Sequence, residues 1–210
     1  MNLPRLYSIA DRASLEAAGI SVRQFAREMA QAGVGVLQYR DKLGSDEEVL
    51  TAAREIAAEF AGRECLLILN DRPELALELG WGVHVGHTDA SPDVVRRMMG
   101  KCPCIIGVST HDEAQMMAAN ASSADYVAVG PVFATASKAD AEAVVGLEGV
   151  RRARAMTSRP LVAIGGITRT NAASVIVAGA DAVAVISALL TPGKAPGELA
   201  SEMLTELQRA

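Results

Sequence analysis

Aromatic side chains, cysteines, basic charge and long apolar runs are all scarce in this sequence. Only 3% of the 210 residues are Phe, Trp or Tyr, although 50% of the residues are hydrophobic. A core made mainly of Ala, Val, Leu and Ile is what layered α/β interiors favour. No uncharged stretch reaches the length of a membrane span, so we expect no membrane partner.

The charge argues against nucleic-acid binding, and the cysteine spacing argues against a metal site. A formal net charge of -5 provides no basic field for nucleic acid or for an anionic membrane. The three cysteines, Cys65, Cys102 and Cys104, have neither CxxC nor metal-site spacing, and we expect each to be a buried thiol. From Met1 through Pro4 the chain enters a strand-like segment without the features of a signal peptide, which predicts a cytoplasmic protein.

Short apolar runs alternate with helix-like segments along the whole chain. The runs expected to be strands are Leu6–Ala10, Val34–Gln38, Leu66–Leu69, Gly82–Val85, Ile105–Val108, Tyr126–Val129, Leu161–Ile164 and Asp181–Ile186. Continuous apolar runs bounded by turns are typical of parallel strands buried on both faces. Eight strand and helix pairs predict an α/β fold with one domain, residues 1–210, built as a (β/α)8 TIM barrel. A doubly wound open sheet is the alternative.

Helix-like segments separate these strands. The expected helices are Val22–Gln31, Asp46–Phe60, Pro73–Leu79, one beginning at Pro92, Glu113–Asn120, Leu147–Met156, one starting near Thr168, and Glu198–Leu207. Asp46, Glu47 and Glu48 lie in the first turn of the helix that begins at Asp46, where the positive end of the helix dipole stabilises negative charge. Ser91 is expected to cap the helix at Pro92.

Polar residues gather directly after the predicted strands. The segments are Gln38–Lys42, Asn70–Asp71, Gly86–Asp89, Ser109–His111 and, on a longer loop, Thr135–Lys138. The carboxyl ends of barrel strands open on one face, and barrel enzymes keep their chemistry on that face. We therefore expect these distant segments to converge on one pocket.

Charged residues in these segments suit a phosphorylated ligand. Gln38, Arg40 and Lys42 alternate, so an extended strand would point all three side chains to one side. The guanidinium group offers a fork to phosphate oxygens and the ammonium group a point charge, although a solvated strand end is the alternative. Asp71 and Asp89 follow neighbouring strands, and one or two carboxylates plus substrate phosphate oxygens commonly hold Mg²⁺. Turn formation and helix capping are the alternatives for these aspartates.

Glycines near the end of the chain suggest a backbone anion site. Gly165 and Gly166 lie in a strand-to-helix turn, and their amides, with those after Ile186, can hold a phosphate without a cationic side chain. In barrels the loops after the seventh and eighth strands often form such a site, although a simple turn is the alternative. The hydroxyl-bearing stretch before Lys138 offers further donors. A lone histidine such as His84 is more often structural than an acid or base.

The chain resembles the thiamine phosphate synthase family over nearly its whole length. The motifs that carry the resemblance are QYRDK (38–42), ND (70–71), VHVGHTD (83–89), GVSTH (107–111), VGPVFATASK (129–138), GLEGV (146–150), AIGGI (163–167) and VIS (185–187). None of them is specific alone, but their order and spacing together are.

The resemblance implies a barrel enzyme that joins a hydroxymethylpyrimidine diphosphate to a thiazole phosphate and releases diphosphate with the help of one Mg²⁺. It places Gln38, Arg40, Lys42, Asn70, Ser109 and Lys138 around the pyrimidine diphosphate, with Asp71 and Asp89 as metal ligands. It places Thr135, Ser137, Gly166, Ile186 and Ser187 at the thiazole phosphate. The catalytic set is Arg40, Lys42, Ser109 and Lys138, and the binding set also includes Tyr39, Asp41 and Ala136. Tyr39, as the outward residue of its strand, is also expected to pack against a helix.

Three departures and two rivals accompany this resemblance. His87 stands where the family usually has Gln, Ser137 where Thr is usual, and Tyr39 where an aliphatic residue is commoner. A thiazole tautomerase shares the barrel, but typically has a histidine where this chain has Pro131, and it does not need two metal carboxylates. A non-catalytic phosphometabolite-binding protein is a more distant rival. Assembly into a homo-oligomer stays open at this level.

Overall fold

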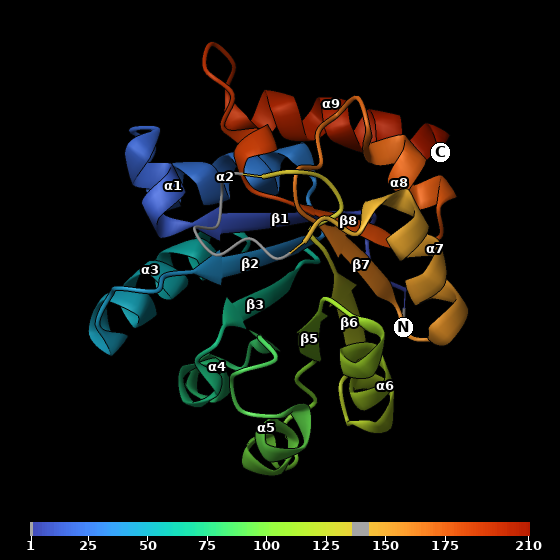
Figure 1. Ribbon diagram of the computed structural model, residues 1–210. Coiled ribbons are helices and arrows are strands. Elements are labelled where there is room, and N and C mark those ends of the chain that lie inside the picture. Colours follow the sequence, from blue (N-terminus) through green and yellow to red (C-terminus); the bar gives the residue numbers. More distant parts are fainter. Residues whose placement is uncertain (1, 136–142) are drawn as a thin grey trace.

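The computed structural model describes residues 2–135 and 143–210 and arranges them as a closed parallel barrel (Figure 1). The strands, in order around the barrel, are β1 (Leu6–Asp11), β2 (Val36–Arg40), β3 (Leu66–Asn70), β4 (Gly82–Val85), β5 (Ile106–Thr110), β6 (Tyr126–Val129), β7 (Leu161–Ile164) and β8 (Ala182–Val185). Each strand pairs with the next, and β8 pairs with β1. The predicted (β/α)8 barrel is confirmed, and the open-sheet alternative is wrong.

Helices surround the strands in Figure 1. They are α1 (Arg12–Ala17), α2 (Val22–Ala32), α3 (Asp46–Glu59), α4 (Pro73–Leu79), α5 (Pro92–Met99), α6 (Glu113–Ala121), α7 (Gly146–Met156), α8 (Ala172–Val177), the 3-10 turn η1 (Ser187–Leu189) and α9 (Pro196–Arg209). The last helix packs against α2 and α8, next to the seam where β8 meets β1. None of the helices in the described part of the chain is both long and apolar enough to span a bilayer.

The helix starts follow local capping chemistry. At α3 the Ser45 hydroxyl accepts from the Glu48 amide, and the Glu48 carboxylate accepts from the Ser45 amide at 2.8 Å. The predicted start of α8 near Thr168 is wrong, because the Asn171 side chain accepts from the Thr168 amide and holds a turn there. Ser91 directly precedes α5, but its side chain makes no capping bond within the described residues.

Side chains on the strands alternate between the barrel interior and the helix-facing shell. On β2, Val36 belongs to the interior cluster, whereas Leu37 and Tyr39 belong to the larger shell under the helices. The next inward positions on β2 carry Gln38 and Arg40 instead of apolar residues. The interior is therefore apolar at the amino ends of the strands and polar at their carboxyl ends.

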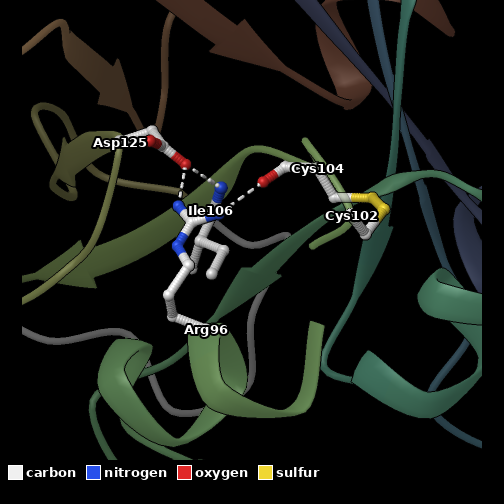
Figure 2. Close-up of a disulfide and its surroundings, with 5 residues drawn as sticks. All are labelled: Arg96, Cys102, Cys104, Ile106 and Asp125. Atoms are coloured by element: carbon white, nitrogen blue, oxygen red, sulfur yellow. Dashed lines mark hydrogen bonds and ion pairs between the residues drawn. A yellow bond between two sulfur atoms is a disulfide. The ribbon is translucent and has the colours of Figure 1, made fainter. Parts of the chain in front are cut away.

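A charged cluster of Arg96 and Asp125, which we call a brace, ties α5 to the amino ends of β5 and β6 (Figure 2). Arg96 on α5 donates to the Asp125 carboxylate at 2.5 Å and to the Cys104 carbonyl at 2.8 Å. The same carboxylate oxygen of Asp125 accepts from the Ile106 amide at 2.6 Å. One aspartate thus ties a helix to the first residue of β5, just before β6 begins.

The arrangement recurs two strands later. Arg154 on α7 donates to the Asp181 carboxylate at 2.8 Å, and the same oxygen accepts from the Leu161 amide at 2.7 Å. Leu161 opens β7 and Asp181 precedes β8, so the helix, strand and loop occupy the same relative positions as in the first brace. These paired braces fix the amino ends of four strands.

Two of the three cysteines form a disulfide instead of remaining thiols. Cys102 and Cys104 form a disulfide beside the first brace, with Cα atoms 5.3 Å apart (Figure 2). The prediction of separate buried thiols is wrong for this pair, because the two cysteines, separated by one residue, lie within bridging distance. Cys65 is free and half-buried, and burial raises the pKa of its thiol to about 12.

The braces predict a stability effect. We expect Asp125→Asn and Asp181→Asn each to lower the free energy of unfolding by about 1–2 kcal/mol, because each removes a charge-assisted bond shared by two donors. The two effects should add in the double variant, since the sites share no partner. Urea unfolding followed by circular dichroism measures both. The control is Glu78→Gln, which breaks an exposed ion pair with Arg54 and should cost less than about 0.5 kcal/mol. A brace variant as stable as this control would contradict the prediction.

Candidate active site

A cavity of about 660 Å³ opens at the carboxyl ends of the strands, and every strand contributes to its lining. Its volume and position suit a small-molecule site of a barrel enzyme. The sequence-predicted residues that line it are Gln38, Arg40, Lys42, Asn70, Asp71, Asp89, Ser109, Thr135, Gly166, Ile186 and Ser187. Ala136, Ser137 and Lys138 lie outside the described residues. The expected convergence of distant segments on one pocket is therefore observed.

Tyr39 and Asp41 are not among the residues that line this cavity. Tyr39 is fully buried under the helices, as expected for the outward residue of β2, and its hydroxyl donates to the Asp41 carboxylate at 3.2 Å. The other Asp41 oxygen accepts from the Leu43 and Gly44 amides at 3.1 and 2.8 Å. Both residues shape the loop that carries the lysine after β2, and their contact with substrate stays a prediction.

Arg40 is held in the cavity by Asp11, the last residue of β1. One Asp11 oxygen caps α1 by accepting from the Ser14 amide and hydroxyl at 3.0 and 2.6 Å, and the other pairs with Arg40. Burial raises the pKa of Asp11, but the bonds from Ser14 and Arg40 outweigh it and hold that pKa below its usual range. The aspartate is therefore ionised and orients the guanidinium group. Asp11 was not predicted from the sequence, although Asp is one of the residues preferred at helix N-caps.

Asp71 pairs with Lys42 across the mouth of the cavity. Its φ of 59° is the only positive value among the described residues other than glycine. Asp tolerates this left-handed conformation better than most residues, and such strain clusters at functional sites. The Asp71 amide donates to the His84 carbonyl at 2.9 Å, which anchors the strained turn to β4. The lysine and the carboxylate thus meet before any ligand is present.

Asp89 closes a turn after β4. Its carboxylate accepts from the Gly86 amide at 2.8 Å, and a Cβ on Gly86 would lie 2.8 Å from the same oxygen. Asp71 and Asp89 therefore line one cavity from the loops after neighbouring strands. No group of three or more His, Cys, Asp or Glu residues able to hold a metal occurs in residues 2–135 and 143–210.

The turn after β7 requires both of its glycines. Gly165 and Gly166 have φ values of 100° and 63°. A Cβ on Gly165 would lie 2.5 Å from the Pro131 side chain, and one on Gly166 would lie 2.5 Å from the Ala134 carbonyl oxygen. The backbone therefore packs closely against the loop after β6. This turn and residues 186–187 line the cavity together, where backbone amides can receive an anion.

The floor of the cavity contains three rings that the predicted site did not include. Tyr7 on β1, His84 on β4 and Tyr126 on β6 all line it, and each is buried. Strand alternation could have placed both tyrosines inside the barrel. Tyr7 lies two residues before Ile9, and Tyr126 lies two residues before Ala128, so each pair points to the same side of its strand. Both tyrosines read as ordinary core residues in the sequence because they lie at the apolar starts of their strands.

Known proteins resemble this chain closely. A family model described as "Thiamine monophosphate synthase" matches residues 6–189. A thiamine-phosphate synthase from Koribacter versatilis is 47% identical over 207 residues, which cover 97% of this chain and 96% of that protein. One from Methanoregula boonei is 42% identical over 186 residues, covering 88% and 85%. The solved structure of a thiamine phosphate pyrophosphorylase from Pyrococcus furiosus aligns with a TM-score of 0.87 at 28% identity, covering 99% of this chain and 97% of that one.

The Asp11 carboxylate predicts a pH-dependent contribution to stability. Asp11→Asn keeps a capping side chain but removes the charge facing Arg40. Because the pKa of Asp11 is lower in the folded chain, its stabilisation is fully present above the unfolded-state pKa and is lost as pH falls through the folded value. We expect Asp11→Asn to lower the free energy of unfolding by about 1–3 kcal/mol near neutral pH, with the difference closing in acid below about pH 4.

The control for this measurement is Asp46→Asn. The Asp46 side chain is 72% exposed in its ion pair with Arg72, whereas the Asp11 side chain is 6% exposed. Removing the exposed charge should cost less than about 1 kcal/mol near neutral pH. A stability difference for Asp11→Asn that stays constant between neutral and acid pH would contradict the assignment.

Proposed function

Because this chain belongs to the thiamine monophosphate synthase family, we propose that it joins 4-amino-2-methyl-5-(diphosphooxymethyl)pyrimidine to 4-methyl-5-(2-phosphooxyethyl)thiazole, forming thiamine phosphate and diphosphate. The observation that carries this proposal is one cavity lined by two cations, two carboxylates and a glycine turn. A diphosphate leaving group and a phosphorylated acceptor require two separate anion sites at one rim. The cations after β2 suit the first, and the backbone after β7 and β8 suits the second.

The reaction breaks one bond and forms another at the same carbon. The bond between the pyrimidine methylene carbon and the diphosphate oxygen breaks, and its electron pair leaves with diphosphate. The electron-rich aminopyrimidine delocalises the resulting cation, and the thiazole nitrogen then donates its lone pair to form the new C–N bond. Neither step requires removal of a proton, so a strong general base is unnecessary. Catalysis then depends on positioning and on binding the charge that grows on the leaving group.

Arg40 and Lys42 are suited to bind that growing charge. Arg40 is fixed by Asp11 through one terminal nitrogen, and within the described residues its other N–H groups have no bonding partner, so they can donate to diphosphate oxygens. Lys42 projects from the loop after β2 and is half-exposed in its pair with Asp71. An ammonium group on a flexible stem can exchange this partner for a phosphate oxygen. Both cations attract the diphosphate more strongly as the C–O bond breaks.

Asp71 and Asp89 fit a Mg²⁺ whose coordination shell the substrate completes. The two carboxylates line one cavity, and Mg²⁺ is usually held by one or two carboxylates together with waters and substrate phosphates. The lack of a larger ligand cluster in the described residues fits this arrangement better than a preformed protein cage. When bound, the ion would neutralise part of the diphosphate charge. Lys42 holds the Asp71 carboxylate toward the cavity mouth until then.

Turnover tests the proposal directly. The purified chain, given both substrates and Mg²⁺, should release thiamine phosphate and diphosphate in equal amounts, and omission of either substrate should abolish both products. Product at the uncatalysed rate with isomerisation of the thiazole would instead favour a tautomerase. Binding of both phosphorylated compounds without any turnover would favour a non-catalytic binding protein.

Substituting the two carboxylates tests the metal assignment. We expect Asp71→Asn and Asp89→Asn each to lower kcat/KM by about 100-fold or more, because the diphosphate then loses charge neutralisation. The matched control is Asp93→Asn, whose carboxylate accepts from the Ser123 amide on the outer surface and should leave the rate near that of the wild type. Calorimetry should also show weaker Mg²⁺ binding in the presence of inorganic diphosphate for both rim variants. Wild-type rates in both would refute the assignment.

A further inference from the structure

Five polar side chains form one continuous hydrogen-bonded row across the inside of the barrel. The Gln38 amide nitrogen bonds to the Tyr7 hydroxyl at 2.8 Å, and that hydroxyl bonds to the Tyr126 hydroxyl at 2.9 Å. The Tyr126 hydroxyl bonds to Nδ1 of His84 at 2.9 Å, and Nε2 of His84 bonds to the Ser109 hydroxyl at 2.9 Å. This polar row connects two residues of the proposed substrate site through three residues that the reaction itself does not use.

The row can cross the barrel because Gly107 has no side chain. Gly107 lies between His84 and Tyr126 in the strand register, paired with His84 on one side and with Tyr126 on the other. A Cβ on Gly107 would lie 2.0 Å from the Tyr126 ring. Because that space is open, the phenol ring reaches over β5 and stacks on the imidazole, with ring centroids 5.5 Å apart. The polar row therefore depends on glycine at this position.

Burial keeps both phenols protonated, and the Gln38 amide then sets the direction of the row. Tyr7 and Tyr126 are buried, which raises the pKa of both phenols, so each hydroxyl keeps its single proton near neutral pH. Within the described residues, the Tyr7 hydroxyl bonds only to Gln38 and Tyr126, and a hydroxyl that accepts from one neighbour donates to the other. With Gln38 donating to Tyr7, Tyr7 donates to Tyr126 and Tyr126 donates to Nδ1 of His84.

The two ends of the row are consequently coupled. His84, accepting at Nδ1, carries its proton on Nε2 and donates to Ser109. Within the described residues the Ser109 hydroxyl has no other partner, so its own proton can point into the cavity. Turning the Gln38 amide over would present its oxygen to Tyr7 and reverse every bond in the row. The His84 proton would move to Nδ1, and Ser109 would have to donate to the ring. A phosphate oxygen only accepts, so a diphosphate in contact with Ser109 favours the direction in which Gln38 donates to Tyr7.

The orientation of the Gln38 amide decides which pyrimidine edge it matches. A 4-aminopyrimidine presents an N–H donor beside the acceptor N3, whereas the 4-oxo analogue presents a C=O acceptor beside an N3–H donor. We propose that Tyr7, Tyr126 and His84 are positioning residues that hold the Gln38 amide in one orientation and thereby make the enzyme select the 4-amino over the 4-oxo pyrimidine diphosphate. This inference rests on the proposed function, which supplies the pyrimidine.

The test compares kcat/KM for the 4-amino and 4-oxo pyrimidine diphosphates. We expect the wild type to prefer the amino compound by about 100-fold or more, since a site built from buried hydrogen-bonding groups rejects a mismatched partner strongly. Tyr126→Phe cuts the row and Tyr7→Phe frees the Gln38 amide, so each should lower this preference by about tenfold or more. The ratio of two kcat/KM values does not depend on the amount of folded enzyme, so partial misfolding of a variant does not distort it.

Ser8→Ala is the matched control. Ser8 lies beside Tyr7 on β1, is fully buried, and donates its hydroxyl proton to the Val36 carbonyl at 3.1 Å outside the row. Loss of this buried hydroxyl should leave the wild-type preference unchanged. The contrary result is that Tyr7→Phe and Tyr126→Phe each lower kcat/KM for the 4-amino and the 4-oxo compound by the same factor, as Ser8→Ala would. In that case the row only supports the fold, and the proposal is overturned.

Nitrogen NMR of the histidines gives a second readout that needs no turnover. The wild type with inorganic diphosphate bound should show His84 as the Nε2–H tautomer, and Tyr126→Phe should show a mixture. A wild-type Nδ1–H tautomer would contradict the direction of the row. Failure to form thiamine phosphate would refute only the proposed function. The His84 tautomer and the calorimetric affinities for the two pyrimidine diphosphates would still decide whether the row selects between these compounds.

Discussion

Closure of the parallel ladder is the constraint on which the site depends. Each strand is held in register by both neighbours, and β8 returns to β1, so every strand ends at the same rim. The register alone sets Asp11 beside Arg40 and Asn70 beside His84. Residues that are distant in the sequence become partners without any loop having to fold over them. The two charged braces at the opposite end support the same closure, because each fixes the first residue of a strand.

The closed rim also brings cationic groups together in a chain with a net charge of -5. Arg40 and Lys42 are gathered on one side of the cavity, and each is paired with an aspartate before a ligand arrives. Asp11 is deeply buried and serves to orient its partner, whereas Asp71 lies in a strained turn at the mouth. After β7 the glycine turn presents backbone groups to the cavity instead of side-chain charge. Local arrangement, and not net charge, therefore gathers the cationic side chains at the rim.

Much of the architecture followed from the sequence because the barrel strands are buried on both faces. Gly82–Val85, Tyr126–Val129 and Leu161–Ile164 were predicted with their observed bounds, since each is an apolar run with clear turns beside it. The six residues of α1 were missed because the helix is short and its capping aspartate is also the last residue of β1. The start of α8 was misplaced because a side-chain bond to the backbone holds a turn in front of it.

The site was predictable where it depends on position along a strand, and not where it depends on contacts between strands. Eleven of the predicted residues line the cavity because residues at strand ends share the rim of any barrel. The polar row was not predicted, because it requires a glycine on β5 exactly between two rings on β4 and β6, and the register between strands cannot be read from one sequence. The Cys102–Cys104 disulfide was missed because the sequence does not show whether two cysteines separated by one residue lie close enough to bond.

A crystal structure of the chain with Mg²⁺ and inorganic diphosphate tests the central claim most directly, namely that the rim gathers its charges to carry away a diphosphate. We predict that the metal contacts Asp71, Asp89 and the diphosphate, and that Arg40 donates to the same diphosphate while still paired with Asp11. Diphosphate bound away from Arg40, or a metal that contacts neither aspartate, would contradict the claim.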